Sequence, residues 1–342
     1  MIKRFIFFRN DRLGDFIILT SVIKKIKDKF KDAHITILSS NLNNKFVRKY
    51  KLIDRCLVYK KESSIFDKLK VLNEVLKYNY FASFAVDGKS FSNLCNFFLK
   101  SNYKYGIVYK FKILNFWLTK PNFIYRFFLF SKYETFTSKK NLNTIEHLPT
   151  KLAKLGNFLG LNIKSSDNYF FDVTKKNDKF FKSFYNKKIK SKYVLIHLDE
   201  KWNDIQNVNS NLFKCLLLLQ KKIKKKLVIT SFNNTNDYFF SFKKSYNKHM
   251  HNKLLLIENA NLFFFERLIN YSIISISCHS GFLVQIAGTN KTNIIDIINK
   301  RDYKWYSCWK PKNTNHKFLF KSNFYKFFSV DDIFRKLALM IK

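Results

Sequence analysis

Short apolar segments alternate with amphipathic segments along most of this chain, in two successive runs. Residues 2–8 are aromatic and β-branched, and the segment after Gly14 carries apolar residues at helical spacing with lysines between them. A second apolar segment follows at residues 35–38. A strand, a helix and a further strand in this order form the unit that builds parallel sheets. The sequence therefore predicts an α/β chain.

The alternation continues through both halves of the chain. In the first half we expect strands at residues 55–59, 81–86 and 105–108, and helices at residues 64–78, 91–99 and 146–161. In the second half we expect strands at residues 193–197, 227–230, 254–257, 273–277 and 293–298, and helices at residues 211–220, 262–270, 281–287 and 331–341. The two runs predict two Rossmann-like domains, whose parallel sheets face a central cleft.

A polar, lysine-rich stretch between Lys164 and Lys192 separates the two runs, and only a helix near Phe180 is expected within it. We place the domain junction there. The predicted domains are residues 1–175 and 176–330, with a closing helix at residues 331–342. A chain of 342 residues that is 46% apolar is long enough to bury two cores.

Basic residues dominate the charge, because 64 Lys and Arg face 24 Asp and Glu, a formal net charge of +40. Such a cation suits nucleic acid, anionic lipid headgroups or phosphorylated substrates. The abundance of Lys, Asn, Ile, Phe and Tyr equally fits an A/T-rich genome. No known nucleic-acid-binding module is visible, and the basic residues are scattered along the chain. A basic nucleic-acid-binding protein therefore stays only as an alternative.

Five cysteines, an odd number with no CxxC pair, favour a reduced cytoplasmic setting. The first residues lack the apolar core and cleavage site of a signal peptide, and no run of 18 apolar residues exists. Residues 110–133 break the alternation with an aromatic and basic segment that contains Pro121. This segment suits an anionic membrane surface or a lipid-linked acceptor. A buried insertion that packs on the first domain explains it equally well.

Two loops that follow predicted strands in the first half contain candidate site residues, because ligands bind at these loops in parallel sheets. The first runs from Arg9 to Asp15 and holds a single glycine, Gly14, before a helix whose exposed amides favour an anion. Asp15 either complements the start of this helix or takes part in chemistry. The second loop, residues 86–89, also fits an ordinary turn.

Two further loops lie in the second half. In residues 197–202, Lys201 offers a point charge to a phosphate, although the segment also fits a solvated loop. In residues 277–281, backbone amides at a helix start could cradle a pyrophosphate. Cys278 is not expected to be a nucleophile, because the adjacent His279 would not point at it and no third group is evident. No zinc-ligand spacing is present. His249 and His251 are expected on a solvated, lysine-rich loop.

The order of these loops resembles glycosyltransferase family 9, the lipopolysaccharide heptosyltransferases. The segment RNDRLGDFIILTSVIKKIKDKFKDAHITIL is similar to the family's opening block, with its Leu-Gly-Asp loop between a strand and an apolar helix. Four later blocks are similar in the same order, namely YNYFASFAVDGKS with YKYGIVY, EHLPTKLAKLGNFLGL, YVLIHLDEKW and ISISCHSGFLVQIAGTNKTNIIDI. The resemblance covers residues 2 to about 298.

The resemblance implies a GT-B fold and an inverting, metal-independent transferase. Such an enzyme would move a heptose or related sugar from a nucleotide sugar, ADP-heptose in the family, to a lipopolysaccharide or other envelope glycan. It would need no cofactor and would work on the inner face of the cytoplasmic membrane. Asp15 would be the catalytic base. The donor-binding residues would be Lys201, His279, Ser280 and Gly281. The residues at the acceptor or the cleft would be Arg12, Gly14, Asp87 and Lys89.

Three departures from the family pattern leave alternatives open. The family has Asp, Pro and His where this chain has His279, Phe282 and Val284. In the family these positions contact the donor's sugar or nucleotide. A different nucleotide sugar, or a GT-B relative that binds a donor without catalysis, is therefore an alternative.

Overall fold

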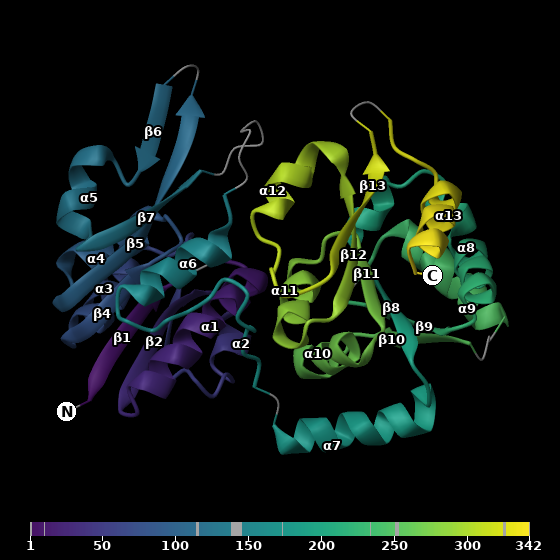
Figure 1. The fold of residues 1–342 in the computed structure, drawn as a ribbon, viewed down its shortest axis with the longest axis horizontal. Coiled ribbons are helices and arrows are strands. Elements are labelled where there is room, and N and C mark those ends of the chain that lie inside the picture. Colours follow the sequence, from purple (N-terminus) through teal and green to yellow (C-terminus); the bar gives the residue numbers. More distant parts are fainter. Residues whose placement is uncertain are drawn as a thin grey trace. The chain divides into compact units, whose positions relative to one another are not determined.

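In the computed structural model, residues 2–341 are described except 10, 114–115, 138–145, 173, 233, 250–252 and 324–325. The chain forms two compact units (Figure 1). The first comprises Met1–Asp172 and Lys304–Lys310, and the second comprises Val173–Tyr303 and Pro311–Lys342. The return of residues 304–310 to the first unit was not expected from the sequence. The Leu148 amide donates to the Cys308 carbonyl across 2.9 Å and so ties this segment to the first unit.

The first unit contains a sheet whose central strands follow the order β3-β2-β1-β4-β5. Their bounds are β1 (Lys3–Phe8), β2 (Ala33–Ser40), β3 (Arg55–Tyr59), β4 (Tyr80–Ala85) and β5 (Ser101–Ile113), and neighbours pair in parallel. β7 (Lys132–Thr137) adds a parallel strand to β5, whereas β6 (Phe116–Lys120) pairs with β5 antiparallel. Only β6 departs from the expected parallel arrangement among the described strands of this sheet, because the two residues between β5 and β6 are too few for a crossover connection.

Six helices lie wholly within this unit, counted over its described residues. They are α1 (Leu13–Lys29), α2 (Asn44–Val47), α3 (Ile65–Leu76), α4 (Ser90–Phe98), α5 (Phe123–Leu129) and α6 (Leu148–Asn157). α1 packs against α6, whereas α4 packs against both α3 and α5. Successive side chains of β1 point to opposite faces of the sheet. Ile6 and Phe8 join a core with Val75 of α3 and Cys95 of α4, while the Phe5 ring contacts Phe30 beyond the end of α1.

The second unit contains a fully parallel sheet over its described strands, in the order β10-β9-β8-β11-β12-β13. The strands are β8 (Tyr193–Leu198), β9 (Lys226–Ser231), β10 (Leu254–Glu258), β11 (Ile274–Ser277), β12 (Asn293–Asn299) and β13 (His316–Ser322). The helices are α7 (Lys175–Phe184), α8 (Val208–Ile223), α9 (Asp237–His249), α10 (Leu262–Tyr271), α11 (Gly281–Asn290) and α13 (Val330–Ile341). α12 (Tyr303–Ser307) begins at the boundary with the first unit.

Two elements of the second unit were missed by the sequence reading. His249 ends helix α9 and does not lie on a loop, while His251 lies outside the described residues. The buried stripe of α9, formed by Tyr238, Phe239 and Phe242, is short and surrounded by lysine and asparagine. Strand β13 was also missed, because its apolar residues alternate with lysines over only a few positions. Within the described residues, no helix combines the length and the apolar character that crossing a bilayer requires.

Candidate functional site

Strand order brings the four candidate loops together in pairs. In the first sheet the order reverses between β1 and β4, and the loops after these strands contain residues 9–12 and 86–89. In the second sheet it reverses between β8 and β11, whose following loops contain residues 199–202 and 278–280. Doubly wound sheets bind their ligands at such reversal points. Each unit therefore presents one candidate site, formed by two loops that are distant in sequence.

Arg9 joins the two loops of the first unit. Its side chain is fully buried, and its Nη2 lies 3.0 Å from Asp15 Oδ1 while its Nη1 lies 3.3 Å from Asp11 Oδ2. Nη1 also donates to the Val86 carbonyl across 2.8 Å, and Nε donates to the Asp15 carbonyl across 3.2 Å. A buried guanidinium needs such partners, because an uncompensated charge in the interior is costly. The sequence reading did not single out Arg9, although a basic residue directly after an apolar strand was its available signal.

Asp15 is the third residue of α1, which has Arg12 at its N-cap position and no side chain capping its first amides. The Asp15 side chain remains 22% exposed. Burial raises its pKa, and the Arg9 guanidinium opposes this increase. Arg9 is therefore the main counter-ion of the Asp15 carboxylate. A carboxylate that is held in place, partly accessible and has a raised pKa is suited to accept a proton.

Asp11 and Asp87 have structural partners of their own. Lys89 Nζ lies 2.7 Å from Asp11 Oδ1, so that Asp11 is held between Lys89 and Arg9. Asp87 accepts hydrogen bonds from the Lys89 amide at 3.0 Å and from the Ser92 hydroxyl at 2.7 Å. Burial and the neighbouring Asp11 raise the pKa of Asp87 to about 6. Asp87 thus shapes the turn into α4, as an ordinary turn residue does, and it also contributes to the charge around Arg9.

Lys201 joins the two loops of the second unit. Its Nζ donates to the His279 carbonyl across 2.7 Å. The short helix that carries it, Glu200–Asp204, is capped by Asp199, whose carboxylate accepts from the Lys201 amide at 3.1 Å. Burial raises the pKa of Asp199 to about 7, although Lys201 opposes the increase. Lys201 is therefore placed beside the start of α11, where a phosphate is expected.

His279 is held by a carboxylate that the sequence reading missed. Its backbone is left-handed, with φ of 57°, and its Nδ1 lies 2.6 Å from Oδ2 of the fully buried Asp296. His316 Nε2 lies 3.4 Å from the same oxygen. Burial alone would raise the pKa of Asp296, but the two imidazoles outweigh it and hold this pKa well below its usual range. A lone Asp within the apolar strand segment IIDII was the signal for such a pair.

The start of α11 leaves room for a ligand. Ser280 occupies the N-cap position, and no side chain caps the helix there. Gly281 is the first helical residue, and a Cβ added to it would meet no atom within 4 Å. Protein packing therefore does not require glycine at this position. Free space at the N-terminus of a ten-residue helix suits the phosphates of a nucleotide.

The remaining positions of this block point into the protein. Cys278 is buried, and burial raises the pKa of its thiol well above the ordinary value, so that it is not an activated nucleophile. Val284 is buried as well, and the Phe282 ring stacks on Phe265 with 5.9 Å between their centroids. Among the described residues, no group of three His, Cys, Asp or Glu side chains is arranged to hold a metal ion.

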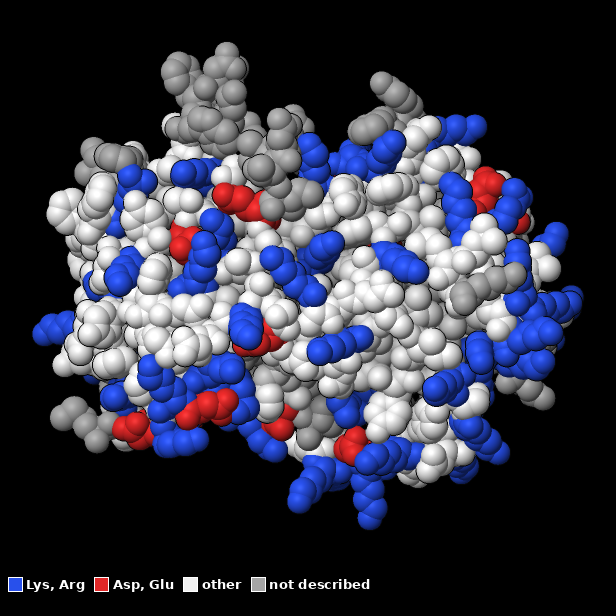
Figure 2. Space-filling view, viewed as in Figure 1, with Lys and Arg blue, Asp and Glu red and all other residues white. Residues whose placement is uncertain are grey.

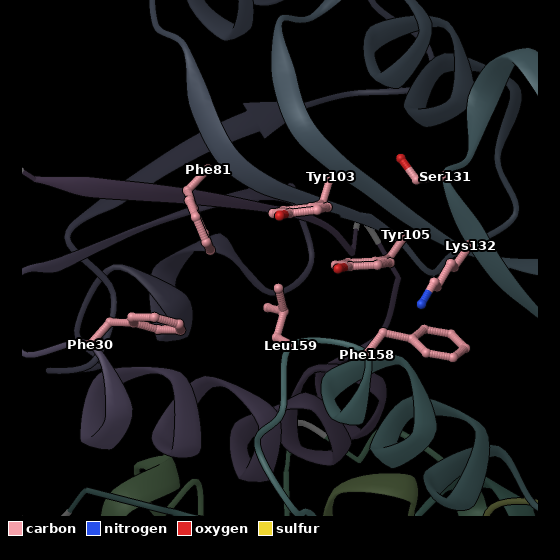
Figure 3. A pocket seen from close by; sticks show the side chains of 8 residues that line it. All are labelled: Phe30, Phe81, Tyr103, Tyr105, Ser131, Lys132, Phe158 and Leu159. Carbon is pink, nitrogen blue, oxygen red and sulfur yellow. The ribbon is translucent and has the colours of Figure 1, made fainter.

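A pocket of about 240 Å³ lies elsewhere in the first unit (Figure 3). Phe81 and Tyr103 in its wall lie near the amino ends of β4 and β5, whereas Asp15 and Asp87 follow the carboxyl ends of β1 and β4. The remaining lining residues are Phe30, Tyr105, Ser131, Lys132, Phe158 and Leu159. This pocket therefore contains none of the candidate site residues.

Comparison with solved structures identifies the fold. A family 9 glycosyltransferase from Veillonella parvula matches with a TM-score of 0.67 and 13% identity, over 93% of this chain and 86% of that one. The E. coli heptosyltransferase WaaC with ADP matches with a TM-score of 0.66 and 10% identity, over 99% and 100% of the two chains. This chain has a GT-B fold. Its resemblance to family 9, first read from sequence blocks, is confirmed at the level of structure.

Other GT-B proteins with a different activity share this fold. The UDP-GlcNAc 2-epimerase from Methanocaldococcus jannaschii matches with a TM-score of 0.58 and 13% identity, over 99% of this chain and 92% of that one. No protein-family model matches the sequence, and no curated protein is significantly similar to it. At such low identities the comparisons show the fold, so the activity of this GT-B chain must be argued from its own residues.

Proposed function

We propose that this GT-B chain is an inverting glycosyltransferase. It transfers a heptose or related sugar from a nucleotide sugar to a lipopolysaccharide or other envelope glycan acceptor. The observation that carries the proposal is the placement of Asp15, which is partly exposed, held by the buried Arg9 and located at the strand-order reversal of the first sheet. The Leu-Gly-Asp block that contains Asp15 favours transfer over epimerisation, because it resembles the opening block of family 9.

In this mechanism Asp15 acts as the general base. Its carboxylate takes the proton of the acceptor hydroxyl while that oxygen attacks the anomeric carbon of the donor sugar. The bond from this carbon to the nucleoside diphosphate breaks, and the configuration inverts. One carboxylate suffices, since a single displacement forms no covalent enzyme intermediate. Asp11, the nearest rival, is held by both Arg9 and Lys89.

The second unit is proposed to bind the donor. The amides at Ser280 and Gly281 would contact the diphosphate at the start of α11, and the Lys201 ammonium would neutralise its charge. His279 would lie beside the sugar or the nucleotide, where its pairing with Asp296 limits its rotation. A lysine and a helix N-terminus can together stabilise a departing diphosphate, which supports the expectation that no metal is needed.

The first unit is proposed to bind the acceptor. Arg12 is exposed next to Asp15, Gly14 is buried, and Lys89 and Asp87 lie on the neighbouring loop. The exposed Arg12 guanidinium suits an acceptor that carries phosphate or carboxylate groups. A glycolipid acceptor would place the enzyme in the cytoplasm, peripherally bound to the inner face of the cytoplasmic membrane.

The face of the molecule in Figure 2 does not favour the alternative of a nucleic-acid-binding protein. Lysine and arginine side chains are spread over both units on the face shown in Figure 2 and do not gather in one stripe. A nucleic-acid-binding face would concentrate them. The other alternative is a GT-B relative that binds a donor without catalysis. Only a measurement of turnover distinguishes it from the proposal.

A mixed library of nucleotide sugars, incubated with the protein and truncated lipopolysaccharide, tests the proposal by mass spectrometry of the products. We expect one added sugar with one donor, and no product with Asp15→Asn. Nucleotide-sugar binding without any product would favour the non-catalytic alternative. Stabilisation by oligonucleotides alone, lost steeply with added salt, would favour nucleic-acid binding.

A further inference from the structure

Helix α4 buries polar side chains and exposes apolar ones, which is the reverse of the usual arrangement. Its buried residues include Ser92, Asn93 and Asn96, whereas Leu94, Phe97 and Phe98 are exposed. The buried amide of Asn96 has hydrogen-bond partners on β4 and α5. Asn96 donates to the Leu129 carbonyl at 2.8 Å and accepts from the Ser83 hydroxyl at 2.7 Å. A surface helix of a globular protein normally turns its apolar side inward. The exposed apolar side of α4 is therefore a candidate binding surface.

Helix α5 extends the same apolar surface. The bond from Asn96 to the Leu129 carbonyl ties α5 to α4. Tyr125, Phe127 and Phe128 are exposed on α5, while Leu129 and Phe130 enter the core. We call these six exposed side chains, three on each helix, the α4–α5 face. Each of them is between 45% and 68% exposed. Exposed apolar side chains on two helices that contact each other are typical of an interaction surface.

The segment of the chain that carries the α4–α5 face holds charges of a single sign. Between Gly88 and Tyr133 the sequence contains seven lysines and one arginine, and neither Asp nor Glu. Two of these cations border the face directly. Lys104 Nζ donates to the Phe97 carbonyl at 2.9 Å, and the Arg126 guanidinium lies 5.1 Å from the centroid of the Phe127 ring. Exposed aromatic rings within a purely cationic segment complement a partner with an apolar interior and a negatively charged surface layer.

We propose that the α4–α5 face docks this protein onto an anionic lipid bilayer. The phenylalanine rings enter the boundary between headgroups and acyl chains, and the lysines and Arg126 remain among the anionic headgroups. The proposal names the surface by which the transferase proposed above would reach a lipid-anchored acceptor, and in that sense it rests on that function. Docking itself requires no turnover.

Flotation with lipid vesicles tests the docking. We expect the wild-type protein to float with vesicles made of equal parts phosphatidylglycerol and phosphatidylcholine. Binding should be weak with pure phosphatidylcholine and should fall as salt rises. The double variant Phe98→Gln/Phe128→Gln should lose binding about tenfold or more, because two rings no longer leave water on docking. Its melting temperature should be unchanged, since both side chains are exposed in the free protein.

The matched control is Phe240→Gln on α9, because Phe240 and Phe98 are both 55% exposed. This control should float as the wild type does. Equal loss in the control and the double variant would overturn the proposal, as would wild-type protein that binds neither kind of vesicle. A concentration-dependent dimer abolished by Phe98→Gln/Phe128→Gln, without vesicle binding, would instead assign the face to a second copy of the chain. Failure of sugar transfer with intact flotation would refute the proposed function and leave the docking surface standing.

Discussion

The guanidinium of Arg9 contacts Asp15 twice, through Nη2 to the carboxylate at 3.0 Å and through Nε to the backbone carbonyl at 3.2 Å. The first contact compensates the charge of the carboxylate, and the second fixes the backbone that carries it. Because Arg9 also binds the Val86 carbonyl, the start of α1 is tied to the loop after β4. Arg9 is therefore a positioning residue for the proposed base and is not itself expected to touch substrate.

Replacing Asp15 with Asn should lower kcat by about 10²- to 10⁴-fold, the usual range for a lost general base. Donor affinity should change little. The free energy of unfolding should fall by about 1–3 kcal/mol, because the buried Arg9 loses one charged partner while Asp11 remains. Asp28→Asn, which changes a more exposed carboxylate on the same helix, is the control. Near-full turnover by a folded Asp15→Asn variant would show that Asp15 is not the catalytic base and has only a structural role in α1.

Replacing Arg9 with Met should shift the acidic limb of the pH profile of kcat/KM to higher pH. The reason is that Arg9 lowers the pKa of Asp15, and a base works only in its deprotonated form. Without the guanidinium this pKa rises further, and activity is lost earlier on acidification. In Arg9→Lys the acidic limb should shift less than in Arg9→Met, because the lysine keeps a positive charge beside Asp15. A variant with reduced kcat/KM but an unmoved limb would show that Arg9 acts only on stability.

Replacing Lys201 with Ala should weaken donor binding by roughly tenfold, the effect of about 1.4 kcal/mol. The KM of the acceptor should stay nearly constant. Titration calorimetry with the nucleotide sugar and with its nucleoside diphosphate measures this effect. Lys221→Ala, at an exposed lysine near the end of α8, controls for the change in net charge. Unchanged donor affinity in a folded Lys201→Ala variant removes Lys201 from the site.

Replacing Gly281 with Ala separates ligand binding from stability. The added Cβ meets no protein atom within 4 Å, and alanine is the better helix former, so the melting temperature should stay equal or rise slightly. Donor affinity should nevertheless fall, because the methyl group occupies space that the diphosphate needs. Thermal unfolding with and without the nucleotide sugar measures both effects. If donor binding is unaffected, the diphosphate lies away from the start of α11.

Much of the fold could be predicted because it is encoded locally. The helical spacing after Gly14 and the apolar runs such as residues 193–197 fall within the observed α1 and β8. The four candidate loops were found for the same reason, since each follows a recognisable strand. Among the elements that were missed, α9 and β13 have short apolar patterns diluted by lysine.

The tertiary structure decided what depends on contacts between distant residues. Only strand order could pair the loop after β1 with the loop after β4, and only that pairing buries Arg9 against Asp15 and Val86. Likewise, His279 and Asp296 meet because β11 and β12 are neighbours. Asn96 of helix α4 is buried, although the sequence pattern of this helix would place its apolar residues inside. The reason is that Ser83 on β4 and the Leu129 carbonyl on α5 form hydrogen bonds with its amide. Periodicity in a sequence reports which side of an element is apolar, whereas the partners of a buried charge or amide are set by long-range packing.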